Sequence, residues 1–92
     1  EKHKVKKAII IGAGISGIEC ADALNKLNIR VSIIESQNRI LPAFLDINSS
    51  NWLVNILEQN NISIYLNETI YSYRYIDSSI SSVILSNSRE LE

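Results

Sequence analysis

Residues 9–17 read Ile9-Ile10-Ile11-Gly12-Ala13-Gly14-Ile15-Ser16-Gly17, and this stretch decides the fold of the chain. The isoleucines are typical of a strand buried on both faces, and they lead directly into the pattern G-x-G-x-x-G. An amphipathic segment follows from Ser16 to Leu27, and a second apolar strand, Val31 to Glu35, ends in an acid. These parts, in this order, predict a β-α-β unit that binds a dinucleotide.

Each glycine of the pattern has a mechanical task. Gly12 permits the tight turn out of the strand, and Gly17 lets the helix pack close to the sheet. Gly14 has no side chain, so backbone N–H groups can approach a pyrophosphate. The N-terminus of the helix adds unpaired N–H groups and the positive end of the helix dipole. The glycines therefore predict a phosphate-binding turn.

The acid Glu35 lies 21 residues after Gly14, close to the offset of the residue that binds an adenosine ribose. Its carboxylate accepts hydrogen bonds from ribose hydroxyls but repels a 2′-phosphate, whose charge is about −1.5 to −2 at neutral pH. The fingerprint therefore favours NAD or FAD over NADP. Arg39 could reach a phosphate from four residues further on, although we interpret it as a solvated loop residue.

Length and composition set the class of protein. Ninety-two residues make one small domain, and a net charge of −1 argues against a general nucleic-acid or membrane-surface role. A single cysteine, Cys20, allows no disulfide within the chain, which suits a reducing cytoplasm. We interpret Cys20 as a buried structural thiol, with a reactive thiol near the helix N-terminus as the alternative. The only histidine, His3, has no ligand set around it, so no metal site is predicted.

Hydrophobic periodicity predicts a doubly wound, three-layer α/β domain with a parallel sheet, followed by an antiparallel β-meander after Leu66. Trp52, Leu53, Ile56 and Leu57 are expected to form the apolar face of the second helix, with Asp46, Asn48 or Ser49 as its N-cap. The predicted strands are Lys7–Ile11, Val31–Glu35, Ile62–Leu66, Ile70–Ile76 and Ile80–Leu85, and the predicted helices are Ser16–Leu27 and Ser49–Gln59.

Tyrosines alternate along the predicted strand Ile70–Ile76, at Tyr71, Tyr73 and Tyr75. Side chains two residues apart share one face of a strand. We interpret the three rings as an exposed or half-packed sheet face, with an aromatic ligand platform as the alternative.

Two segments resemble a known family. Residues 12–21 are similar to the G-x-G-x-x-G-x-E-x-A signature of the NAD(P)H-binding domain in FAD-dependent pyridine nucleotide–disulfide oxidoreductases, and residues 39–44 resemble the loop after the acid. This family includes NADH oxidases, rubredoxin reductases and nitrite reductase flavodomains. The resemblance covers nearly the whole chain and implies a Rossmann-like domain.

The resemblance also implies roles. The chain would be one domain of an oxidoreductase, and it would bring the nicotinamide of NADH to a flavin. FAD would be bound mainly by another domain of the same polypeptide. Glu35 would hold the adenosine ribose, and Glu19 would lie near the nicotinamide end unless it is simply an exposed helix residue. No catalytic residue is expected in the chain itself. The pyrophosphate would be held by Gly12, Gly14 and Gly17 and by the backbone of Ile15 and Ser16.

Relatives that use NADP often have basic residues just after the acid. In this chain the residues that follow Glu35 are not basic, and this departure favours NAD. We expect residues 1–90 to form the NAD(H)-binding domain, as a fragment of a longer flavoenzyme, and residues 91–92 to be a tag remnant. Two alternatives stay open. One is the FAD-binding segment of an amine-oxidase-like flavoenzyme, although the Arg-x-Gly-Gly loop of those enzymes is replaced by Arg39-Ile40-Leu41-Pro42. The other is a non-catalytic nucleotide-sensing module.

Overall fold

The computed structural model describes residues 6–41 and 43–92. The expectations for His3 and for Pro42 fall outside these residues. The elements follow the order β-α-β-α-β and then an antiparallel excursion. They are β1 (Lys7–Ile11), α1 (Ile15–Lys26), β2 (Arg30–Glu35), α2 (Ile47–Gln59), β3 (Ile62–Leu66), β4 (Ile70–Ile76), β5 (Ser79–Leu85) and β6 (Glu90–Leu91).

The first three strands form a parallel sheet in the order β1-β2-β3. Ile10 pairs with Ile33 between β1 and β2, and Ile33 pairs with Ile64 between β2 and β3. Parallel neighbours need a crossover connection, and α1 and α2 provide the two crossovers. The predicted parallel β-α-β-α-β arrangement is confirmed.

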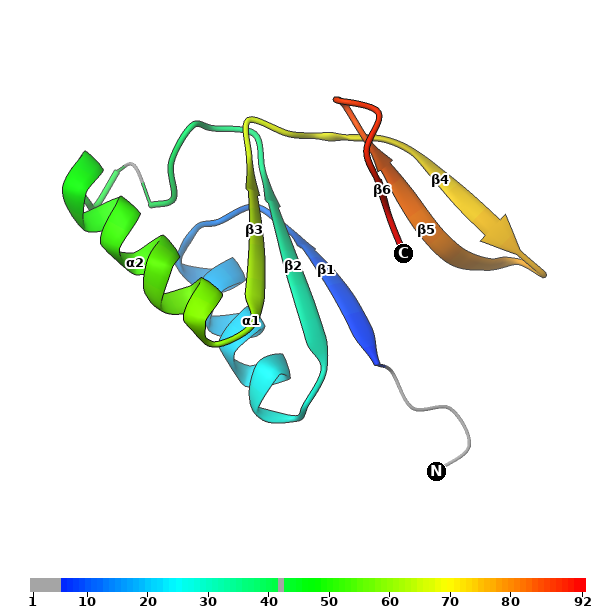
Figure 1. The fold of residues 1–92 in the computed structure, drawn as a ribbon, viewed down its shortest axis with the longest axis horizontal. Coiled ribbons are helices and arrows are strands. Elements are labelled where there is room, and N and C mark those ends of the chain that lie inside the picture. The colour runs from blue at the N-terminus through cyan, green and yellow to red at the C-terminus, as the bar shows by residue number, and fades with distance from the viewer. Residues whose placement is uncertain (1–5, 42) are drawn as a thin grey trace.

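The two faces of this sheet are covered by different kinds of layer. Both helices lie on one face, and the antiparallel sheet of β4, β5 and β6 lies on the other side (Figure 1). The three layers and the β-meander are confirmed, but the expectation of a doubly wound domain, with helices on both faces, is wrong for the described residues. The reason is that the chain after β3 crosses the second face as a β-meander instead of a helix.

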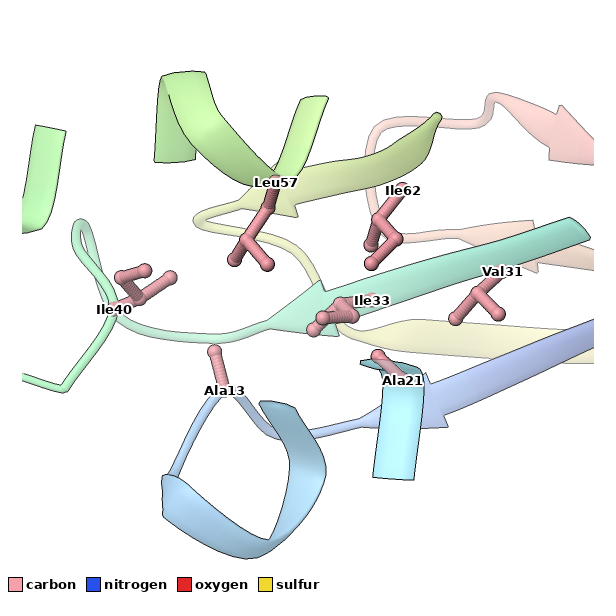
Figure 2. Close-up of a cluster of buried hydrophobic side chains, with 7 residues drawn as sticks. All are labelled: Ala13, Ala21, Val31, Ile33, Ile40, Leu57 and Ile62. Atoms are coloured by element: carbon pink, nitrogen blue, oxygen red, sulfur yellow. The ribbon is translucent and has the colours of Figure 1, made fainter. Parts of the chain in front are cut away.

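The main core lies between the helices and the parallel sheet. It combines residues from β2, β3, both helices, the glycine turn and the loop after β2 (Figure 2), namely Ala13, Ala21, Val31, Ile33, Ile40, Leu57 and Ile62. A smaller cluster joins the parallel sheet to the meander through Ile34, Val83 and Leu85. Every described layer is therefore joined to its neighbour by buried apolar side chains.

Local signals at the helix ends agree with the sequence. Asp46 is the N-cap of α2, where its carboxylate accepts a hydrogen bond from the Ser49 N–H at 2.8 Å. Asn28 and Asn61 follow the two helices with φ of 63° and 68°. Asparagine tolerates this left-handed conformation better than most residues, so it can end a helix. These residues fix where each crossover returns to the sheet.

The exposed helix surfaces differ from the expectation. Trp52 is 64% exposed, although Leu57, another residue of the predicted apolar face, is buried. Cys20 is also exposed, so its interpretation as a buried thiol is wrong. In α1 the position that meets the sheet is the adjacent Ala21, which is fully buried. A helix on a three-stranded sheet buries only a narrow stripe, and residues one position away turn towards solvent.

In the meander, β4 and β5 form an exposed hairpin beside the parallel sheet. Its tyrosines Tyr71, Tyr73 and Tyr75 are 79%, 43% and 61% exposed, as expected for an open sheet face. A groove of about 940 Å³ lies between β1 and the hairpin, lined by side chains such as Ile9, Ile11 and Ile80. Among the described strands, β1 pairs only with β2.

Candidate dinucleotide-binding site

The glycine loop begins where β1 ends. Gly12 has φ of 101°, a conformation that favours glycine, and its N–H donates to the Ile34 carbonyl at 2.8 Å. This hydrogen bond continues the ladder between β1 and β2 by one residue. The chain then turns sharply and enters α1.

Gly17 is needed for the packing of α1 on the loop. A Cβ atom at this position would lie less than 3.0 Å from the carbonyl oxygen of Gly12, a separation that real Cβ atoms essentially never show. The close approach expected from the sequence is confirmed. It places the first turn of α1 directly over the end of β1.

Gly14 occupies the N-cap position of α1 and faces open space. A Cβ atom there would meet nothing within 4 Å. Glycine supplies no capping side chain, and the first turn of the helix contains no acidic residue. The N-terminus of α1 thus keeps the features that bind an anion: N–H groups without a side-chain cap, a positive dipole end and room for a phosphate.

Glu35 ends β2 and is 9% exposed. Its carboxylate reaches the glycine loop, where Oε1 accepts a hydrogen bond from the Ala13 N–H at 2.6 Å. The other oxygen, Oε2, accepts from the Gln37 N–H at 2.8 Å. A carboxylate has about four acceptor sites, so Glu35 keeps capacity for hydroxyl donors. The structure therefore brings the predicted acid and the predicted glycine turn into direct contact.

The loop after Glu35 is held against the site. The Leu41 N–H donates to the Ala13 carbonyl at 3.2 Å, and Ile40 is fully buried in the core. The Ser50 hydroxyl of α2 donates to the Ile40 carbonyl. Sequence reasoning missed the contributions of Ile40, Leu41 and Ser50. The available signal was the pair Ile40-Leu41 directly after four polar residues, 36–39.

Arg39 and Asp46 bring opposite charges to the same loop. The hydrogen bonds from Ser49 lower the pKa of the Asp46 carboxyl below its usual value, and the positive charge of Arg39 adds to this effect. Arg39 is half-buried, which differs from the solvated residue that we expected.

The remaining predicted site residues lie on α1. Ile15 and Ser16 are exposed in its first turn, and Glu19 is exposed in the second turn. Glu19 therefore lies along the helix from the glycine loop, apart from the contact between Glu35 and Ala13. Within residues 6–41 and 43–92, no group of His, Cys, Asp or Glu side chains could hold a metal ion. Neither described helix has the length and apolar character that crossing a bilayer requires.

Residues 7–89 match the model of the pyridine nucleotide-disulphide oxidoreductase family. The chain belongs to this family. Among curated relatives, it is 33% identical over 79 residues to the soluble pyridine nucleotide transhydrogenase of Sodalis glossinidius, covering 86% of this chain and 17% of the relative. It is 30% identical over 70 residues to the NADH oxidase of Methanocaldococcus jannaschii, covering 76% of this chain and 16% of the relative.

A solved structure shows the same fold in this oxidoreductase family. It is an FAD-dependent pyridine nucleotide-disulphide oxidoreductase from Desulfovibrio vulgaris, which superposes with a TM-score of 0.90 at 28% identity and covers 97% of this chain and 22% of that chain. The Rossmann-like fold expected from the sequence is thereby confirmed. The chain spans less than a fifth of the length of the two curated relatives.

Proposed function

We propose that the chain is the NAD(H)-binding domain of an FAD-dependent oxidoreductase. The observation that carries the proposal is the juxtaposition at the glycine loop: α1 begins at Gly14 with open space before it, and Glu35 lies against the same loop. A helix N-terminus suits a pyrophosphate, and a carboxylate beside it suits a ribose with free hydroxyl groups.

The dinucleotide would be bound along the first turn of α1. The N–H groups of Ile15, Ser16 and Gly17 hold the pyrophosphate, while Gly12 and Gly14 provide the turn and the space. The remaining acceptor sites of Glu35 hold the adenosine ribose. Glu19, one turn further along the helix, borders the nicotinamide half.

NADH and FAD, when bound, would supply the redox chemistry of hydride transfer. This chain binds and orients NADH, and FAD is bound mainly by another part of the same polypeptide. Its membership of the family and its likeness to a protein named NADH oxidase support this assignment.

Calorimetric titration of the 92-residue chain with NADH and with FAD tests the proposal. We expect the chain to bind NADH, to lack the yellow absorbance of a retained flavin after purification, and to catalyse no oxidation of NADH alone. Glu58→Gln is the matched control, because Glu58 is exposed at the far end of α2 from the glycine loop. Retention of FAD without binding of NADH would instead support the flavin-binding alternative.

A further inference from the structure

The backbone of Ala13 is held through the peptide groups on both sides of its Cα atom. Its N–H donates to the Glu35 carboxylate at 2.6 Å, and its carbonyl accepts from the Leu41 N–H at 3.2 Å. The side chain of Ala13 is 1% exposed and packs in the main core (Figure 2). Ala13 joins Gly12 to Gly14, so its orientation sets the direction in which the chain enters α1.

We propose that Glu35 is a positioning residue for the glycine loop, in addition to any contact with a ribose. In the ligand-free protein its carboxylate joins the Ala13 and Gln37 N–H groups, and this bridge keeps the first turn of α1 ready for a pyrophosphate. Only the expected effect of this bridge on pyrophosphate binding rests on the proposed function. The effect on the loop is a property of the protein alone.

Burial explains why the bridge is strong. Glu35 is 9% exposed, so its carboxylate loses most of its water, and hydrogen bonds from two backbone N–H groups replace that water. Hydrogen bonds to a charged group are stronger than those between neutral groups. Both oxygens accept, so an amide in place of the carboxylate would present an NH₂ group to one of the two N–H donors.

Amide hydrogen exchange of the ligand-free chain tests the positioning role. In Glu35→Gln we expect the Ala13 amide to exchange at least about tenfold faster than in the wild type, which corresponds to about 1.4 kcal/mol. Glu58→Gln is the control and should leave the Ala13 amide unchanged. An unchanged Ala13 amide in a folded Glu35→Gln variant would overturn the proposal.

Inorganic pyrophosphate, followed by the amide shifts of Gly14 to Gly17, separates the two roles of Glu35. This probe has no ribose, and Glu35→Gln removes a nearby negative charge. Electrostatics alone would therefore strengthen pyrophosphate binding in the variant. We expect binding at least about threefold weaker, because the first turn of α1 is no longer held. Stronger or equal binding would contradict the positioning role.

Glu35→Asp keeps the proposal testable if Glu35→Gln does not fold. It retains the charge and an acceptor for a ribose, but the side chain is one methylene shorter and cannot bridge both donors. We expect faster exchange of the Ala13 amide here too, and native protection would overturn the proposal. If the wild type does not bind NADH, the proposed function fails, while the exchange of Ala13 still reports on the bridge.

Discussion

A Cβ atom added at Gly17 would lie less than 3.0 Å from the carbonyl oxygen of Gly12. The same carbonyl belongs to the residue with φ of 101° that turns the chain out of β1. Helix and turn are thus fitted to one another with no room for a methyl group. The contact is between backbone and Cβ, so no change of side-chain rotamer can relieve it.

We predict that Gly17→Ala destabilises the chain by about 1–3 kcal/mol, the range typical of overpacking. The midpoint of urea unfolding measures this loss. Gly14→Ala is the matched control, because a Cβ there meets nothing within 4 Å and φ is −83°. Equal midpoints for the two variants would show that α1 can shift away from Gly12 without loss.

Gly14→Val should weaken the binding of NADH while the chain stays folded. The side chain would extend into the open space where the pyrophosphate is proposed to lie. The expected loss is a few kcal/mol, because hydrogen bonds to charged groups contribute about 1.5–3 kcal/mol each. Calorimetry measures the affinity and circular dichroism checks the fold. Unchanged affinity in a folded variant would remove the pyrophosphate from this position.

The wild-type chain should prefer NADH over NADPH by at least about tenfold, or about 1.4 kcal/mol. The reason is the repulsion between the Glu35 carboxylate and a 2′-phosphate. Glu35→Ser should narrow or reverse this ratio. It should also weaken the binding of NADH itself, because the acceptor for the Ala13 N–H is removed.

The pair of dissociation constants, at low and moderate salt, measures this preference. Equal affinities for the two dinucleotides in the wild type would remove the ribose role from Glu35. A Glu35→Ser variant that keeps the wild-type affinity for NADH would show that the carboxylate neither binds the ribose nor positions the loop.

Asp46 should make the stability of the chain depend on acid pH. Its pKa in the folded chain lies below the ordinary value of 3.8, mainly because of the hydrogen bonds from Ser49. Its stabilising contribution is therefore complete above pH 3.8 and is lost as the pH falls through the lower, folded pKa. Asp46→Asn keeps an N-cap acceptor without the titration. The melting temperatures of the wild type and of Asp46→Asn, measured at about pH 6 and about pH 2.5, should lie closer together at the lower pH.

Trp52 and Leu57 should respond very differently to truncation, although they share the predicted apolar face of α2. Trp52 is 64% exposed and Leu57 is 7% exposed. We expect Trp52→Ala to change stability by no more than about 0.5 kcal/mol and Leu57→Ala to remove about 2–5 kcal/mol. Urea unfolding measures both. A larger loss for Trp52→Ala than for Leu57→Ala would contradict the packing of α2.

The strands and the glycine turn were predictable because their signals are local. The alternation at Ile62–Leu66 and the glycines at 12, 14 and 17 act within a few residues, and the structure places them as expected. The partner of Glu35 was not predictable. Its contact with Ala13 spans 22 residues and depends on how closely β1 and β2 are paired.

The exposure of individual side chains on the helices was also not predictable from the sequence. Periodicity indicates an apolar face but not how wide a stripe the neighbouring layer covers. Trp52 and Cys20 both fall just outside that stripe. Ile40 shows the opposite case, because a loop residue without any periodic pattern is fully buried between α2 and the sheet.

The single pairing of β1 has a practical consequence for experiments on this chain. Among the described strands β1 hydrogen-bonds only to β2, and the groove between β1 and the hairpin is lined in part by Ile9 and Ile11. An open strand edge next to apolar side chains favours strand addition between copies, and so self-association and aggregation. Dissociation constants and melting temperatures therefore need to agree at two protein concentrations before they are assigned to the monomer.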